Sequence, residues 1–290
     1  MRFFLVLLFY VSNCLYGFER PLTAIICSYN NKDWAFRNLS SVLTQDYKNY
    51  QVVYIDDCST DGTTLEVEKY LKSIQADYQI VEFNITAKSH RINAVKFARQ
   101  ISKKAHRITI VKNSSRQGSL ANFYRAGHSC EDNEIILRID GDDWLRDDQV
   151  FRVINEAYND SGVWLTHGSL ICYPSGKVGW SIPVPEKNIQ ANSFRKWRCP
   201  SHLLTCYAWL YKKVRLEDQL YEGEFFQAAV DQAIIFPMME MAGNRHFFIS
   251  TPLYIYNEAN CININKVQTR AQNESELFIR SQPPYEKLPN

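Results

Sequence analysis

Aspartates gather in two short polar segments, and their spacing suits a metal ion and a phosphorylated ligand. The first segment is Asp56-Asp57-Cys58-Ser59-Thr60-Asp61-Gly62, and the second is Asp140-Gly141-Asp142-Asp143. An Asp-x-Asp pair can hold Mg²⁺ or Mn²⁺ through one or two carboxylates and leave positions open for phosphate oxygens. The bound ion then neutralises charge on a leaving phosphate group. Asp140 and Asp142 are therefore the candidate metal ligands.

Both acidic segments follow directly after an apolar, β-branched run that predicts a buried strand. These runs are residues 51–55 and 135–139. In open α/β sheets, ligands bind beyond the carboxyl ends of the strands. We therefore expect the two acidic loops to converge at one sheet edge, where their negative charge favours a cation.

Strand-like and helix-like segments alternate along the first half of the chain, which predicts an α/β domain with a mainly parallel sheet. No linker, repeat or low-complexity tract divides the sequence, so residues 18–267 are expected to form one domain. Residues 268–290 are polar and contain Pro283-Pro284, and are expected to be a loosely packed tail. The other predicted strands are 22–27, 78–83 and 108–111, and the predicted helices are 33–43, 63–74 and 118–129.

The first acidic segment also fits part of the EF-hand calcium loop. Asp57, Ser59, Asp61 and Glu68 occupy ligand positions, with Gly62 at the turn. That loop requires a helix on its N-terminal side. A strand precedes it here, so the calcium interpretation is rejected.

Three segments, taken in order, resemble the family-2 glycosyltransferases. They are Thr23-Ala-Ile-Ile-Cys-Ser-Tyr-Asn30, Val53-Tyr-Ile-Asp-Asp-Cys-Ser-Thr-Asp-Gly62 and Asp140-Gly-Asp-Asp143. The corresponding family loops are T-Y-N, D-D-x-S-x-D-x-T and D-x-D-D. The resemblance runs from Leu22 to Trp144 and continues more weakly to Asn265.

This resemblance implies a GT-A fold, a single Rossmann-like nucleotide-binding domain on a mixed, mainly parallel sheet. It also implies an inverting glycosyltransferase that moves a sugar from a nucleotide diphosphate to a hydroxyl group. UDP is the nucleotide it favours, Mn²⁺ or Mg²⁺ the cofactor, and a glycan, lipid or protein the acceptor.

On the donor side, the resemblance assigns the loop of Tyr29 and Asn30 to the nucleotide, with Tyr29 packed against the base. Asp56 or Asp57 accepts a hydrogen bond from the base edge, and the sequence leaves their order open. The alternative for both is a pair of loop acids that cap the next helix.

The same resemblance gives Asp140 to the ribose and metal shell and Asp142 to the metal itself. Asp143 is assigned to the acceptor or donor sugar. Arg116 and Gly118 stand where the family lets backbone approach the donor, and Arg116 would offset diphosphate charge. A plain strand-to-helix turn near Gly118 explains the same residues equally well.

On the acceptor side, Asp231 occupies the place of the family's catalytic base, within an otherwise apolar helical run. A carboxylate in such a run is costly to bury without a role or a partner. Val230 departs from the family pattern, which commonly has Glu there. The alternative is a charge at a helix start paired with Lys or Arg, and Glu222 and Glu224 are reserve candidates.

Trp180 and His202 lie between the metal loop and the predicted base, in the interval that shapes the family's acceptor pocket. Trp180 would stack on a sugar face, and His202 would contact diphosphate or acceptor. Aromatic rings are usually buried, so a place in the core is the alternative for each. Lys266 is a further possible diphosphate contact.

Composition restricts the other functions. A net charge of +2 gives no basic surface for nucleic acid. The loop after residue 27 lacks the G-x-G-x-x-G of dinucleotide-binding enzymes. The remaining alternatives are an inactive GT-A relative that binds nucleotide or glycan, and a phosphatase with Asp140 as nucleophile.

The N-terminus resembles a secretory signal: Arg2 is followed by an apolar run from Phe3 to Val11 and by small residues up to Gly17. The run is shorter than the roughly 20 residues a transmembrane helix needs. Residues 1–17 therefore predict an exported or lumenal protein. A lipid-bearing Cys14 and a packed N-terminal element are the alternatives, and the latter would leave the protein cytoplasmic.

Overall fold

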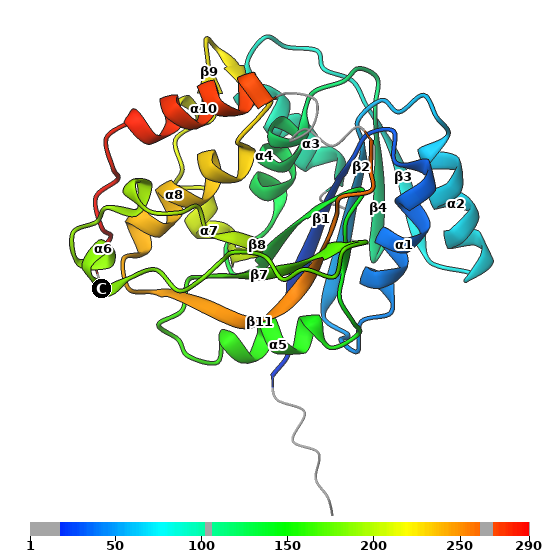
Figure 1. The fold of residues 1–290 in the computed structure, drawn as a ribbon. Coiled ribbons are helices and arrows are strands. Elements are labelled where there is room, and N and C mark those ends of the chain that lie inside the picture. Colours follow the sequence, from blue (N-terminus) through cyan, green and yellow to red (C-terminus); the bar gives the residue numbers. More distant parts are fainter. Residues whose placement is uncertain (1–17, 102–105, 262–268, 290) are drawn as a thin grey trace, which may run out of the picture.

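The computed structural model describes residues 18–101, 106–261 and 269–289 (Figure 1). The predicted signal segment 1–17 and Lys266 lie outside the described residues. Within them, no helix is long and apolar enough to cross a membrane.

A nine-stranded mixed sheet forms the centre of the molecule, in the order β3-β4-β2-β1-β5-β8-β7-β11-β6. The first five strands in this order are parallel to one another. β8 runs antiparallel between β5 and β7, β11 is parallel to β7, and β6 is antiparallel to β11. The sheet strands are β1 (Leu22–Ser28), β2 (Tyr50–Asp56), β3 (Tyr78–Phe83), β4 (Ile108–Asn113), β5 (Ile135–Asp140), β6 (Trp144–Leu145), β7 (Leu165–Tyr173), β8 (Ser201–Tyr207) and β11 (His246–Asn257), and β9 (Leu220–Tyr221) with β10 (Glu224–Phe225) forms a separate hairpin.

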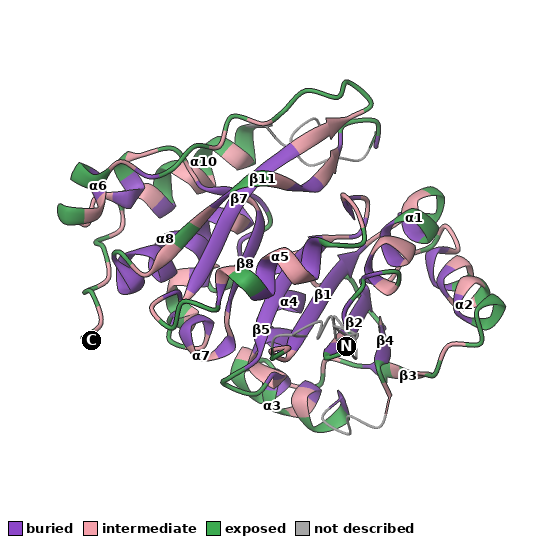
Figure 2. Ribbon diagram, turned by 90° about the horizontal axis from the view of Figure 1, so that it is seen from below, coloured by how far each residue is buried: buried purple, intermediate pink, exposed green. Residues whose placement is uncertain are grey.

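Helices cover both faces of this sheet. The helical elements are α1 (Lys32–Leu43), α2 (Thr63–Ser73), α3 (His90–Ile101), α4 (Ser119–Ser129), α5 (Val150–Ala157), α6 (Glu186–Gln190), α7 (Ala208–Tyr211), α8 (Val230–Ala242), α10 (Thr269–Ser281) and the 3₁₀ turns η1 (Phe194–Lys196) and η2 (Leu216–Gln219). One apolar core packs α3, α4, α7 and α8 on one face, and a second packs α1, α2 and α5 on the other. Figure 2 shows the resulting band of buried strands between the helices.

The side-chain alternation of β1 explains why both faces need cover. Ile25 and Cys27 point into the first core, whereas Ala24 and Ile26 point into the second. A strand that is apolar on both faces is typical of a sheet between two helical layers. The α/β fold and the mixed, mainly parallel sheet expected from the sequence are confirmed, as is a strand, not a helix, before Asp57.

The C-terminal residues differ from their prediction. Instead of a loose tail, Thr269–Ser281 form α10, and the chain beyond it stays against the domain. Ile279 is 3% exposed within the first core, and Tyr285 and Leu288 pack against that core. The polar character that suggested a tail belongs to the outer face of this helix.

Candidate active site

A cavity of about 250 Å³ opens at the carboxyl edge of the parallel strands, where the loops after β1, β2, β4 and β5 meet the start of α8. Asn30, Asp56 and Trp180 do not contribute to its lining. The predicted residues that do are Tyr29, Asp57, Arg116, Gly118, Asp140, Asp142, Asp143, His202 and Asp231.

Asp57 holds the loop that precedes α4. Its Oδ1 accepts hydrogen bonds from the Gln117 backbone N–H and from Asn113 Nδ2, both at 2.8 Å. Its Oδ2 accepts the Gly118 N–H at 2.8 Å. Gly118 has φ +86, and a Cβ there would lie 2.6 Å from Gln227 Oε1, so glycine is required at this position.

The structure separates the two neighbouring aspartates that the sequence left open. Asp56 turns away from the cavity: its Oδ1 accepts the Ser59 N–H at 2.9 Å, and its Oδ2 accepts the Thr64 hydroxyl. Asn30 connects the loop after β1 to the loop after β2, because its Oδ1 accepts the Thr60 N–H at 2.9 Å. Of the Asp56–Asp57 pair, only Asp57 reaches the cavity.

Tyr29 and Arg116 meet at the wall of the cavity. The Arg116 guanidinium carbon lies 4.0 Å from the centroid of the Tyr29 ring, a cation–π contact. One face of the ring that was predicted to pack on a base is therefore covered by a cation.

The acidic loop after β5 is held close to β1. The Gly141 N–H donates to the Cys27 carbonyl at 2.9 Å, and a Cβ on Gly141 would lie 2.5 Å from Ser28 Cβ. Asp140 accepts from Arg138 Nη2 at 2.6 Å, while Asp142 Oδ2 accepts from Asn260 Nδ2 at 2.8 Å. Burial, and then the negative charge of Asp140, raises the pKa of Asp142 to about 6.

Asp143 lies beneath this loop with 1% of its surface exposed. Its Oδ1 accepts the Asn257 backbone N–H at 2.7 Å, which ties the loop to β11. Burial, with the charges of Asp142 and Asp140, raises its pKa. Its predicted contact with a sugar remains untested, and in this structure the carboxylate anchors the loop.

Asp231 lies in the first turn of α8, where the helix dipole favours a negative charge. The rest of α8 is buried, but Asp231 itself borders the cavity. Its Oδ2 is 3.9 Å from the Cys199 thiol, which can donate to it. Glu222 and Glu224, the reserve candidates, are exposed on the β9–β10 hairpin and do not line the cavity.

His202 reaches the cavity, whereas Trp180 does not. The His202 ring stacks on Tyr254, with centroids 4.7 Å apart and planes 14° from parallel. Burial lowers the His202 pKa, so the ring is neutral near pH 7. Trp180 is 62% exposed outside the lining residues, so its prediction as an acceptor contact is not supported by its position.

Comparison with known proteins identifies the first two strand-and-loop units. Residues 23–84 match the model of the family described as "Glycosyl transferase family 2". This segment carries Tyr29 and Asp57, and the third motif, Asp140–Asp143, follows at the same sheet edge. Residues 23–84 thus resemble the glycosyltransferases of family 2.

Its curated relatives match over short stretches. A Bacillus subtilis protein named as a putative teichuronic acid biosynthesis glycosyltransferase, TuaG, is 39% identical over 54 residues, which are 18% of this chain and 21% of that protein. An uncharacterised glycosyltransferase of Haemophilus influenzae is 23% identical over 133 residues, 46% of this chain and 31% of that protein. The matches thus span less than a third of either relative.

Solved structures share the fold over most of this chain. S. aureus TarS 1-349 in complex with UDP-GlcNAc superimposes with a TM-score of 0.60 at 17% identity, covering 89% of this chain and 65% of that one. The mannosyltransferase PcManGT of Pyrobaculum calidifontis, in complex with GDP-Man and Mn²⁺, has a TM-score of 0.54 at 17% identity, covering 92% and 66%. These likenesses establish the GT-A fold.

The protein also lines its cavity with residues that sequence reasoning missed. Arg138 had a detectable signal: a charge inside an apolar strand is costly unless paired, and its position two before Asp140 puts both on one face. No such signal in the sequence pointed to Asn260, Gln227 or Gln272, because polar residues in loops and helices are common. Only the fold brings them to the cavity.

The acidic pair fits a divalent ion only in part. Among the described residues, no group of three or more His, Cys, Asp or Glu side chains could hold a metal by itself. Mg²⁺ is typically bound by one or two carboxylates together with substrate phosphates and water. Asp142 and Asp140 satisfy that requirement. Burial, and after it the negative charge of Asp140, raises the pKa of Asp142, and a cation would relieve the repulsion between the two carboxylates.

Proposed function

We propose that this chain is a glycosyltransferase that moves a sugar from a UDP-sugar to a hydroxyl group, with inversion and with the help of a divalent metal ion. One observation carries the proposal above all others. A single cavity is lined by the acidic pair Asp140 and Asp142 on the β5 loop and by a separate carboxylate, Asp231, at the start of α8.

The nucleotide side is supported by Tyr29, Asp57 and the Gly118 loop. The three N–H groups bound to Asp57 fix the backbone at Gly118 in the lining of the cavity. Arg116 brings positive charge to the same wall and would offset a diphosphate. The TarS structure with UDP-GlcNAc supports UDP as the nucleotide.

Asp142, with Asp140, would hold Mn²⁺ or Mg²⁺ together with the donor diphosphate. Bound there, the ion supplies a Lewis acid that stabilises the charge of the departing nucleoside diphosphate. Arg138 fixes the orientation of Asp140 through its 2.6 Å ion pair. Asn260 does the same for Asp142.

Asp231 would be the general base. As a carboxylate it accepts the proton of the acceptor hydroxyl while that oxygen attacks the anomeric carbon. Attack opposite the departing diphosphate inverts the configuration. Its place in the first turn of α8 sets the carboxylate at the positive end of the helix dipole.

Calorimetry with UDP, with and without Mn²⁺, tests the donor site. We expect Mn²⁺-dependent binding to the wild type and a loss of about tenfold or more in affinity for Asp142→Asn, since a directly ligating carboxylate is removed. Asp231→Asn should still bind UDP but lose roughly 10²–10⁴-fold in transfer rate.

The possible outcomes separate the alternatives. UDP binding without turnover of any UDP-sugar would favour an inactive relative that retains the nucleotide site. Binding of GDP in place of UDP would keep the transferase proposal and change the donor. If the folded protein binds no nucleotide at all, the proposal is wrong.

A further inference from the structure

The C-terminal helix contributes one side chain to the cavity. Gln272 of α10 lines it together with Ala229 and Asp231 of the α8 start. No other described residue after Asn260 does so. A role for Gln272 in the reaction rests on the proposed function, because this helix borders the acceptor side of the same site.

The orientation of the Gln272 amide is set by its partner. Its Oε1 accepts the backbone N–H of Ala229 at 2.8 Å. A backbone N–H can only donate, so the atom facing it must be the amide oxygen. The Nε2 group, with two N–H donors, is therefore turned to the other side of the amide and is not used by that contact.

Ala229 is a position that needs support. It has φ +52, in the left-handed region that non-glycine residues seldom adopt, and it is the N-cap of α8 two residues before Asp231. The N-cap makes no side-chain hydrogen bond to its own helix. The contact from Gln272 thus stabilises the backbone that carries the proposed base.

Gln227 provides the complementary group. Its Nε2 donates to the Phe225 carbonyl at 3.0 Å, and its amide group lies against Gly118. Gln227 and Gln272 thus bring two side-chain amides to the cavity. A sugar hydroxyl can both donate and accept, so this pair suits neighbouring hydroxyl groups.

The charges of the cavity point to the same class of ligand. Asp57, Asp140, Asp142, Asp143 and Asp231 outnumber the cations Arg116 and Arg138 in its lining. Arg138 is already paired with Asp140, and Arg116 lies over Tyr29. A divalent ion would neutralise Asp140 and Asp142, but Asp231 would remain, and an acceptor carboxylate or phosphate placed against it would be repelled by its charge.

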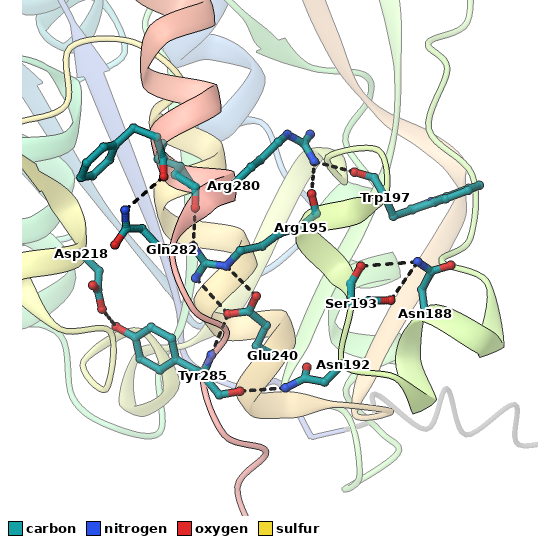
Figure 3. Close-up of polar contacts among 12 residues, drawn as sticks. Asn188, Asn192, Ser193, Arg195, Trp197, Asp218, Glu240, Arg280, Gln282 and Tyr285 are labelled. Atoms are coloured by element: carbon teal, nitrogen blue, oxygen red, sulfur yellow. Dashed lines mark hydrogen bonds and ion pairs between the residues drawn. The ribbon is translucent and has the colours of Figure 1, made fainter.

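A buried polar cluster holds α10 in this position (Figure 3). Arg195 donates to both oxygens of Glu240 at 2.7 and 2.9 Å, and Glu240 Oε2 also accepts the Tyr285 N–H at 3.0 Å. Arg195 reaches the Ile279 carbonyl, while Arg280 donates to the Trp197 carbonyl at 2.7 Å. These contacts fix the end of α10 from both sides.

We propose that Gln272 is a positioning and acceptor-binding residue: its Oε1 holds Ala229 in place beneath Asp231, and its Nε2 donates to a hydroxyl of an uncharged sugar acceptor. The two roles can be separated by substitution. Gln272→Glu keeps an oxygen for the Ala229 N–H and removes the N–H donors. Gln272→Ala removes both, and Asn273→Asp changes an exposed amide to an acid on the same helix as the control.

Hydrogen exchange tests the positioning role without any substrate. We expect Gln272→Ala to accelerate exchange at Ala229 and the first turn of α8 by about tenfold, as expected for the loss of one hydrogen bond. Gln272→Glu and Asn273→Asp should leave those rates near the wild-type values. The positioning role is refuted if the amides of Ala229 and the first turn of α8 exchange no faster in Gln272→Ala than in Asn273→Asp. This result holds whether or not the protein proves to be a transferase.

Transfer to matched probes tests the acceptor role. The probes are p-nitrophenyl hexosides and the corresponding hexuronides, offered with a panel of UDP-sugars after Mn²⁺-dependent UDP binding has been measured. We expect the neutral hexosides to be the better acceptors. Gln272→Glu should raise the acceptor KM about tenfold with kcat little changed, whereas Gln272→Ala should also lower kcat.

Three results would overturn this role while leaving the nucleotide site intact. They are a preference for the hexuronides, an absence of transfer to every neutral hexoside by a protein that binds UDP, and equal acceptor KM values for Gln272→Glu and Asn273→Asp. A failure to bind UDP would instead overturn the proposed function. The exchange experiment would still show whether Gln272 stabilises the backbone at Ala229.

Discussion

Gly141 is the residue on which the geometry of the acidic loop depends. It stands between Asp140 and Asp142, and its backbone lies against β1 so closely that a Cβ would be 2.6 Å from Ser28 Cα. Backbone atoms cannot move aside as the end of a long side chain can. The glycine of the D-G-D-D motif is thus required by the packing of β5 against β1.

Gly141→Ala is expected to destabilise the protein by about 1–3 kcal/mol, because the added methyl group overpacks the β1–β5 contact. It should also weaken Mn²⁺-dependent UDP binding by displacing Asp142. Urea unfolding measures the first effect. Gly162→Ala is the control, since its Cβ would meet only the end of the Asp160 side chain at 3.1 Å; equal losses for the two variants would contradict the argument.

At the scale of elements, β7 and β11 place two histidines side by side, of which His167 is buried and His246 half-buried. His167 Nε2 and His246 Nδ1 are 3.3 Å apart, beside Phe248. Burial lowers the pKa of His167 to about 3 and that of His246 to about 4, with a further contribution to His167 from the charge of His246. Both rings are therefore neutral in the folded protein near pH 7.

This pair predicts a loss of stability in acid. Between the ordinary histidine pKa near 6.5 and the lowered values, the unfolded chain binds protons that the folded chain does not. The free energy of unfolding should fall as the pH drops from about 6.5 to 4, by up to roughly 1.4 kcal/mol per pH unit for each histidine.

The measurement is urea unfolding from pH 7 to 4 for the wild type and His246→Gln. The difference between the two curves isolates this pair from the carboxylates of the acidic loop, whose raised pKa values act in the opposite direction. Phe248→Leu changes the same cluster but removes no titratable group. It should shift the plot of unfolding free energy against pH without changing its shape. Parallel curves for wild type and His246→Gln would refute the prediction.

The polar cluster under α10 is a second test at this scale. Glu240 is fully buried and Arg195 is 8% exposed, so removal of either leaves a buried charge without its partner. Glu240→Ala is expected to cost about 3–5 kcal/mol of unfolding free energy. Glu276→Ala, which breaks the more exposed pair with Arg280, should cost less than about 1 kcal/mol. Similar costs for the two would show that the buried pair contributes little.

At the scale of the whole molecule, the cavity joins parts that are distant in sequence. The family match covers residues 23–84, yet the lining extends to Asn260 and Gln272. The nucleotide side comes from the loops after β1, β2 and β4, whereas Asp231 and Gln272 come from α8 and α10. The two sides should therefore respond separately to truncation.

Deletion of residues 269–290 is expected to lower the free energy of unfolding by about 2–4 kcal/mol, because it removes Ile279 from the core and the Tyr285 contact from Glu240. UDP binding should persist in the fraction that remains folded, since no deleted residue lies on the nucleotide side. Calorimetry and urea unfolding of the shortened chain measure both. If the shortened chain is fully folded but does not bind UDP, the two sides of the cavity are coupled.

Local sequence pattern was enough to specify the five parallel strands β1–β5 and the motifs that follow them, but not the four remaining strands of the sheet. Apolar runs of strand length fix β1, β2, β4 and β5 because such runs must be buried on both faces, and the polar loops after them must then lie at one edge. That reasoning placed Asp140 and Asp142 at the cavity, whereas Tyr29 was assigned by resemblance and also lines it. Asp231 was found by resemblance, and the structure brings it to the same place.

Long-range contacts determine which polar groups are available to a ligand. Asp56 and Asp57 are adjacent and chemically identical, and only their hydrogen bonds show that one turns into its own loop. Trp180 proved exposed, and the polar C-terminal segment proved to be a packed helix that delivers Gln272. The local sequence pattern indicates which face of a helix or strand is buried. Contacts between elements that are distant in sequence depend on how the whole chain packs around the sheet.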